Sequence, residues 1–387
     1  MLALVNGSLY TPTEFIPRGV LLVEGGKITA VGPAGRGAIP RRAERLDLGG
    51  RVVTPGLIDL HFYGALGAAI TDPGTAAQAL HQIAEALPRW GTTAFLISPL
   101  RLDRELLPDL LRALRDAMSF PSPGADPLGI HLEGPYLNPS YRGAFDPAVL
   151  RWPDLSEAQA WWAAAGPCLR MITIAPELPK ALETARWLRR RGVRLSMGHS
   201  GASFEEAQSA IRTGFRLVTH CYNAMIGFHH RAPGVVGAAW LNPLVTAMVI
   251  ADGFHVHPAA FRLLIRVKGI RRVVLTTDAI PALGLGEGVY TFGGQEVLVK
   301  GGRAILLDGT LYGSMLTMDR AVHNAMAFAA LSFAEALRMA TLNPAHALGL
   351  QNKGRLAPGA DADLVVWGED GAPQLTMARG GIVWQRP

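Results

Sequence analysis

The middle of the chain, residues 53–350, alternates short apolar runs with amphipathic stretches of helical length. The runs are rich in β-branched residues, which favour strands, and most are followed by a segment with helical periodicity. The predicted strands are 52–60, 92–98, 128–132, 171–175, 194–197, 217–219, 246–251 and 272–276. Eight βα units in about 230 residues predict a closed (β/α)8 barrel of parallel strands.

A doubly wound open sheet is the competing α/β fold. Such sheets usually carry a Gly-rich phosphate-binding turn directly after the first strand. Here the first strand runs into His61-Phe62-Tyr63, and no such fingerprint follows it. We therefore favour the barrel.

Both ends of the chain predict short strands separated by Gly-rich turns. These strands lie over 2–6, 19–24, 27–31 and 43–47, and over 362–367, 374–378 and 381–385. The simplest arrangement places them in one small β domain. We therefore predict a β-sandwich formed from residues 1–52 and 351–387, attached to a catalytic barrel formed from residues 53–350.

The formal net charge of +6 and the pI of about 9.6 indicate an acidic partner. Nucleic acid is the first candidate for such a partner. However, only five lysines are present, the arginines are dispersed, and no nucleic-acid-binding motif accompanies them. We expect a small anionic ligand and no nucleic-acid partner.

The two cysteines, Cys168 and Cys221, cannot form a disulfide framework, which favours a reducing compartment. The first residues include no basic leader and no cleavage-like site. The longest apolar helix candidate, 325–342, is interrupted by Glu335 and Arg338, whereas a membrane span needs roughly 20 apolar residues. We expect a cytoplasmic protein without a membrane partner.

Histidines and carboxylates follow nearly every predicted barrel strand. They are His61, Glu133, Glu177, His199, His220, Asp252, His255 and Asp278. The carboxyl ends of barrel strands carry the chemistry in this fold. Among these residues, Glu133, His199 and His220 offer the oxygen and nitrogen ligands that suit Zn²⁺ or a similar divalent ion. We predict a metal site at these three strand ends.

Two interpretations remain open for Asp278. Its carboxylate could move protons in a hydrolytic reaction, or it could cap a following helix. For His257, which precedes Pro258, we favour a helix start, whereas His255 suits a substrate contact. Arg231 lies in a long loop after the sixth strand, where it could bind phosphate or simply be solvated.

The motifs occur together, in order, over nearly the whole chain. The strongest are Pro-Gly-Leu-Ile-Asp-Leu-His at 55–61, His-Leu-Glu-Gly-Pro at 131–135, Gly-His-Ser at 198–200, Thr-His-Cys-Tyr-Asn-Ala-Met at 219–225, His-His-Arg at 229–231 and Thr-Asp-Ala at 277–279. With these motifs, the chain resembles the N-acetylglucosamine-6-phosphate deacetylases of the amidohydrolase superfamily. The resemblance implies hydrolysis of a linear amide C–N bond, which releases glucosamine 6-phosphate and acetate.

The resemblance also implies roles for particular residues. It places one divalent metal per subunit (zinc first, with iron, cobalt, manganese or nickel as alternatives) on Glu133, His199 and His220, with His61 beside it, and it makes Asp278 the general acid and base. Substrate contacts would fall on Ala144, Asn223, Ala224, Arg231, Asp252, His255, Tyr312 and Gly313. In the family, the arginine that matches Arg231 reaches the neighbouring subunit's site, which implies a homodimer.

Two departures from the family pattern bear on the chemistry. Many members carry His-x-His after the first strand for a second metal, but here Tyr63 takes the second histidine's place, and a phenol with a reference pKa near 10 is a poor ligand. We therefore expect one metal. Phe145 stands where the family has a histidine that contacts the acetyl carbonyl. Two alternatives to hydrolysis of N-acetylglucosamine 6-phosphate therefore stay open. One is a deacetylase of another N-acyl sugar or amino-acid derivative, and the other is a non-catalytic sugar-phosphate-binding relative.

Overall fold

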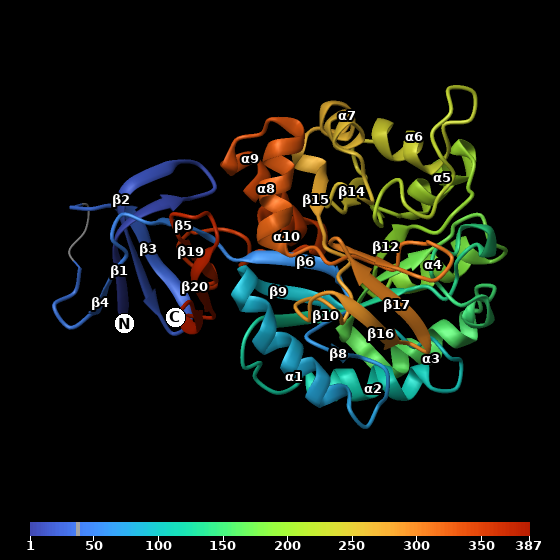
Figure 1. Cartoon of the computed structure of the whole chain (residues 1–387), viewed down its shortest axis with the longest axis horizontal. Helices are drawn as coiled ribbons and strands as arrows, with labels where there is room; N and C mark the ends of the chain where they lie inside the picture. The colour runs from blue at the N-terminus through green and yellow to red at the C-terminus, as the bar shows by residue number, and fades with distance from the viewer. Residues whose placement is uncertain (36–38) are drawn as a thin grey trace.

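A computed structural model describes residues 1–35 and 39–387 of the chain. Figure 1 shows a large barrel with helices around it and a smaller β domain at one side, where both termini lie together. The eight barrel strands are β6 (Leu57–Phe62), β9 (Thr92–Ile97), β10 (Asp126–Glu133), β11 (Leu169–Ile174), β12 (Arg194–Met197), β13 (Leu217–Val218), β14 (Thr246–Val249) and β15 (Val273–Leu275). The predicted (β/α)8 architecture is confirmed.

The barrel sheet is parallel and its strands follow one another in chain order, from β6 to β15. A bridge between Phe62 and Ala279 joins its first and last edges, and the amide of Asp278 donates to the carbonyl of His61 over 3.0 Å. Closure therefore brings the end of the first strand beside the segment that follows the eighth.

Helices cover the outside of this barrel, and their buried faces form the largest hydrophobic core with the strands. They are α1 (Ala76–Ala86), α2 (Leu107–Ala117), α3 (Leu155–Ala165), α4 (Ala181–Arg189), α5 (Phe204–Thr213), α6 (Gly234–Leu241), α7 (Pro258–Lys268), α8 (Met318–Ala329), α9 (Phe333–Ala340) and α10 (Leu342–Leu348). Within the described residues, no helix has the length and apolarity that a membrane crossing requires.

The small domain is a sheet built from both ends of the chain. Its strands are β1 (Leu2–Tyr10), β2 (Phe15–Glu24), β3 (Lys27–Pro33), β4 (Glu44–Asp47), β5 (Val52–Pro55), β19 (Leu364–Trp367), β20 (Pro373–Ala378) and β21 (Gly381–Gln385). In this sheet β5 lies between β1 and β19, so an N-terminal strand pairs directly with a C-terminal one.

The predicted first barrel strand, 52–60, is wrong as a single element. It divides at Gly56 into β5 of the small domain and β6 of the barrel. A Cβ at Gly56 would lie 2.0 Å from Thr93 Oγ1, so only glycine allows the chain to pass this close to β9. The apolar run conceals the division because both strands are buried.

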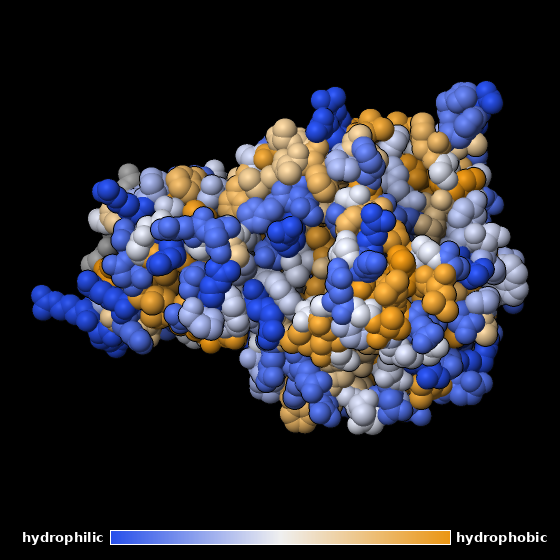
Figure 2. Space-filling model, viewed as in Figure 1, coloured by the Kyte–Doolittle hydropathy of each residue, from blue (hydrophilic) through white to orange (hydrophobic). Residues whose placement is uncertain are grey.

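A three-stranded hairpin sheet and a shorter pair complete the structure. They are β16 (Gly288–Phe292), β17 (Gln295–Lys300) and β18 (Arg303–Ile305), and β7 (Gly64–Ala65) and β8 (Ala68–Ala69). The first three form an excursion between β15 and α8 with a small core of their own, which includes Tyr312. Figure 2 shows hydrophobic residues over this part of the barrel, and Val289 of β16 is 65% exposed.

A buried lysine joins the two domains. Lys353 Nζ lies 2.8 Å from Asp363 Oδ2, 2.9 Å from Asp126 Oδ2 and 3.1 Å from Asp361 Oδ2, although its side chain is only 6% exposed. Asp126 begins the barrel strand β10, whereas the other two carboxylates precede β19 of the small domain. Burial acts to lower the pKa of Lys353, but Asp363 and Asp126 raise it, so the ammonium stays charged.

We predict that Lys353→Met lowers the free energy of unfolding by about 3–5 kcal/mol, because it leaves the buried carboxylate of Asp363 without its cation. Urea unfolding followed by circular dichroism measures this change. Lys27→Met is the matched control, since Lys27 also pairs with Asp361 but is 47% exposed. Equal losses in the two variants would show that burial does not set the strength of this contact.

Candidate active site and metal centre

Polar side chains from five barrel strands converge at one end of the barrel. His61 lies near the end of β6, Glu133 ends β10, and His199, His220 and Asp278 follow β12, β13 and β15. The last three residues have positive φ values of 49°, 30° and 53°. A positive φ strains the backbone of any residue other than glycine, and residues strained in this way cluster at functional sites.

Glu133 stands at the centre of this cluster. Its Oε1 lies 2.8 Å from His220 Nε2 and 3.1 Å from His199 Nε2, and the two nitrogens are 3.1 Å apart. His199 Nδ1 donates to the carbonyl of Tyr141 over 2.9 Å, so in the neutral ring Nε2 presents a lone pair to the carboxylate. Converging lone pairs repel one another unless a cation lies among them, and this donor set fits a divalent metal.

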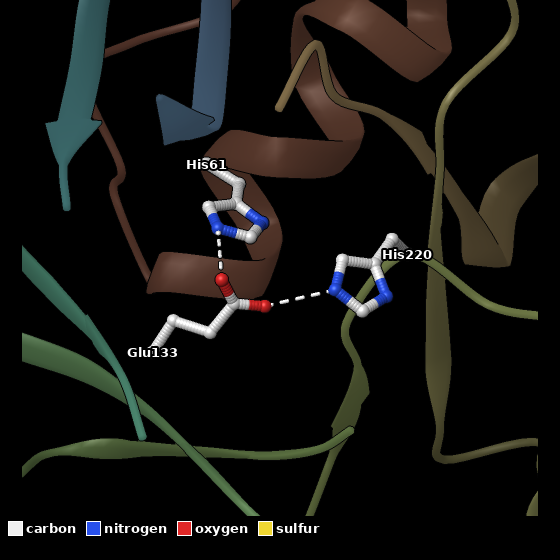
Figure 3. A group of neighbouring side chains, drawn as sticks. All are labelled: His61, Glu133 and His220. Atoms are coloured by element: carbon white, nitrogen blue, oxygen red, sulfur yellow. Dashed lines mark hydrogen bonds and ion pairs between the residues drawn. The ribbon is translucent and has the colours of Figure 1, made fainter. Parts of the chain in front are cut away.

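The other carboxylate oxygen of Glu133 faces His61 and Tyr63. His61 Nε2 lies 3.1 Å from Oε2, and the phenol of Tyr63 also donates to Oε2. Figure 3 shows His61 above the carboxylate of Glu133 and His220 to its right, each with a ring nitrogen directed at a different carboxylate oxygen. The ligating atoms of these three residues all lie within 4.8 Å of one another.

Opposite charges lie close together at this centre and shift one another's pKa. Burial acts to raise the pKa of Glu133, but His61 and His199 hold that pKa well below its usual range. Burial acts to lower the pKa of His61, while Glu133 and Asp278 raise it to about 9. The carboxylates therefore stabilise positive charge here, whether a proton or a metal supplies it.

Tyr63 remains a neutral phenol in this environment. Burial, together with the negative charges of Glu133 and Asp278, raises its pKa well above the usual value near 10. A neutral phenol donates a hydrogen bond but is a weak ligand, which supports the expectation of one metal. The number of metals stays a prediction.

Asp278 faces the same cluster, with its Oδ1 3.6 Å from His61 Nε2. Burial raises the pKa of Asp278, His61 lowers it, and Glu133 raises it further, so the pKa lies above its ordinary value. The helix-capping alternative does not fit, because the next α-helix, α8, begins only at Met318. A carboxylate with a raised pKa beside a metal-binding set suits proton transfer at neutral pH.

A cavity of about 530 Å³ opens over the cluster, a size typical of small-molecule sites. Glu133, His199, His220 and Asp278 line it. Six of the predicted substrate residues also line it, namely Ala144, Asn223, Ala224, His255, Tyr312 and Gly313. Whether they contact substrate stays a prediction.

The structure places the other two predicted substrate residues elsewhere. Asp252 lies behind His255, where its Oδ2 is 2.6 Å from His255 Nδ1 and its Oδ1 accepts the amides of Phe254 and His255. It therefore orients His255 and does not line the cavity itself. Arg231 is exposed in the loop before α6, with its Nη1 2.9 Å from His230 Nε2, and does not line its own chain's cavity.

Two other strand-end residues have structural roles. The ring of His257 accepts the amide of Ala259 and caps α7, as the favoured interpretation predicted. Glu177 accepts hydrogen bonds of 2.7 Å from Ser200 Oγ and from the amide of Gly201, so it holds the loop that carries His199.

Sequence reasoning missed two groups that line the cavity. One is the turn of the β16–β17 hairpin, where Gln295 Nε2 donates to the carbonyl of Ala144 over 3.0 Å. The sequence does indicate this turn, because Gly293-Gly294 lies between two runs that alternate apolar and polar residues, a pattern typical of a hairpin. The other is the segment 100–103 after β9, which carries no distinctive motif.

Known proteins resemble this chain in both sequence and structure. Residues 52–383 match the amidohydrolase family. An N-acetylglucosamine-6-phosphate deacetylase of Bacillus subtilis is 36% identical over 97% of this chain and 96% of its own, and an N-acetylgalactosamine-6-phosphate deacetylase of Escherichia coli O157:H7 is 36% identical over 89% of each. A Mycobacterium smegmatis N-acetyl-D-glucosamine-6-phosphate deacetylase variant, solved with N-acetyl-D-glucosamine-6-phosphate, has a TM-score of 0.91, 33% identity and 99% coverage of both chains. The chain belongs to the N-acetylglucosamine-6-phosphate deacetylase family of amidohydrolases.

Proposed function

We propose that this protein hydrolyses the acetamide of N-acetyl-D-glucosamine 6-phosphate to D-glucosamine 6-phosphate and acetate, a step of amino-sugar catabolism. The observation that carries the proposal is the position of Asp278, which lines one cavity with Glu133, His199 and His220. A metal-binding set and a carboxylate with a raised pKa are the parts that metal-assisted amide hydrolysis needs. The choice of substrate is supported by relatives that match most of the chain and are N-acetylglucosamine-6-phosphate deacetylases.

Glu133, His199 and His220 would hold one divalent metal per subunit, with His61 beside it. Zinc suits this donor set best, and iron, cobalt, manganese or nickel suit it as well. When bound, the ion supplies a Lewis acid that polarises the acetamide carbonyl and lowers the pKa of a water molecule. The hydrogen bond from Tyr63 to Glu133 Oε2 leaves Oε1 as the oxygen that faces His199 and His220.

Asp278 carries the protons of the reaction. Its carboxylate accepts a proton from the water that attacks the acetyl carbon, and it returns this proton to the amide nitrogen as the C–N bond breaks. Burial raises its pKa and thereby makes it a stronger base than an exposed aspartate. The amine leaves in its neutral form, and the second product is acetic acid, which ionises to acetate at neutral pH.

The sugar phosphate would contact Ala144, Asn223, Ala224, His255, Tyr312 and Gly313, with Asp252 orienting His255. Arg231 would reach the cavity of a neighbouring subunit in a homodimer. The exposure of Arg231 and its absence from its own chain's cavity support this arrangement. A guanidinium suits phosphate because it can donate two parallel hydrogen bonds.

Phe145 favours a second candidate function, the deacetylation of another N-acyl sugar or amino-acid derivative. Its ring lines the cavity and packs edge-on against His199, with centroids 5.2 Å apart. A phenyl ring cannot donate a hydrogen bond to a developing oxyanion. The complete set of Glu133, His199, His220 and Asp278 argues against a merely sugar-binding protein, because binding alone needs no general base.

We predict that Asp278→Asn lowers kcat for N-acetylglucosamine 6-phosphate by about 10²–10⁴-fold, because an amide cannot accept the proton. Acetate release measures the rate, while circular dichroism and elemental analysis serve as controls for fold and metal content. Full turnover by a folded, metal-loaded variant would exclude Asp278 as the general base.

Phe145→His should raise kcat for acetate release by about 10²-fold, since one oxyanion donor contributes at least that much in other hydrolases. Phe145→Leu is the matched control and should give no gain, because leucine has no donor. If the wild-type protein releases no acetate and only the histidine variant does, the native activity proposed here is wrong.

Intermolecular complementation tests the role of Arg231. Arg231→Ala and Asp278→Asn should each be nearly inactive, whereas their co-expressed mixture should recover about a quarter of wild-type turnover, because each mixed dimer contains one intact site. Subunits that do not share sites would give no recovery. The double variant Arg231→Ala/Asp278→Asn, co-expressed with wild type, controls for expression level.

A further inference from the structure

Two barrel loops form one part of the cavity wall. Segment 100–103 follows β9, and the facing segment 145–149 follows β10. Leu100, Leu102, Phe145 and Val149 line the cavity from these two loops, and we call this part of its wall the apolar lobe. The metal-binding chemistry does not use these four side chains.

The apolar lobe lies opposite two of the predicted substrate contacts, Asn223 and His255. In barrel order β9 and β10 are the second and third strands, whereas β13 and β14, which precede Asn223 and His255, are the sixth and seventh. Loops four strands apart face each other across the mouth of an eight-stranded barrel. A substrate whose sugar contacts Asn223 and His255, and whose carbonyl lies near Glu133, therefore directs its acyl chain towards the apolar lobe.

Arg151 fixes the width of the apolar lobe. Its Nη1 donates to the carbonyls of Leu102 and Val149, over 2.9 and 2.8 Å, so one guanidinium ties the two walls together. Glu157 accepts from Arg151 Nε over 2.8 Å, and the arginine side chain is only 13% exposed. These buried polar contacts fix the two walls relative to each other without a ligand.

An ion pair flanks Leu102 of the apolar lobe in the loop after β9. Arg101 Nε lies 2.6 Å from Asp103 Oδ2, both residues line the cavity, and both are partly exposed. A short alkyl chain would stay among the four apolar side chains, whereas a long one would reach charged groups. The lobe therefore suits acyl groups a few carbons long.

We propose that the apolar lobe binds the acyl chain of the substrate, and that this enzyme hydrolyses N-propionyl and N-butyryl glucosamine 6-phosphate at least as well as the N-acetyl compound. The inference rests on the proposed function. The reaction is the same, in that water adds to the acyl carbon, the C–N bond breaks, and the amine leaves with the proton from Asp278. Each additional methylene buried in the lobe increases kcat/KM by up to about fourfold.

The test compares kcat/KM for the three N-acyl glucosamine 6-phosphates, with release of the primary amine as the measurement. We expect propionyl and butyryl values equal to or above the acetyl value. Values lower by about tenfold or more would overturn the inference, because that is the cost of forcing a methylene into a site without room for it. If the enzyme cleaves none of the three compounds, the proposed function itself fails.

A narrowing variant tests whether the chain lies in the apolar lobe. Val149→Trp should lower the butyryl-to-acetyl ratio of kcat/KM by about tenfold or more, because the indole fills the lobe. Val289→Trp, on the exposed face of β16, is the matched control and should leave the ratio unchanged. An unchanged ratio in Val149→Trp would place the acyl chain elsewhere, and the wild-type substrate series decides the inference even if this variant does not fold.

Discussion

The active site depends on one buried carboxylate that four other residues share. Glu133 receives contacts from His199 and His220 on one oxygen and from His61 and Tyr63 on the other. A carboxylate this deeply buried is stable only when positive charge or several donors surround it. The barrel satisfies this requirement because it brings the ends of β6, β10, β12 and β13 to one point, although these residues are far apart in the chain.

Sequence patterns predicted the barrel and the residues of this cluster for the same physical reason. A parallel barrel exposes the carboxyl end of every strand at one face, so polar residues just after buried runs identify the site. Patterns of this kind could not reveal relations between distant loops. The bonds from Arg151 to Leu102 and Val149, and the place of Asp252 behind His255, depend on side-chain directions that spacing does not record.

At the domain junction and in the hairpin, the local sequence does not show which sheet or site an element joins. Residues 52–60 form one apolar run because β5 and β6 are both buried, although they belong to different sheets. The hairpin over β16–β18 alternates exposed and buried residues, which predicts strands but not that their turn lines the cavity. In both cases, local sequence determines the type of element and tertiary packing determines its partner.

The pairing of β5 with β19 has a consequence for how the chain reaches its native state. During synthesis the N-terminal strands emerge first, but β19 and β20 follow more than 300 residues later. Until then, one edge of β5 has no strand beside it, and an uncovered edge readily pairs with other chains. β19 thus covers this edge only after the whole barrel has been synthesised, and a chain that stalls within the barrel leaves β5 open to such pairing.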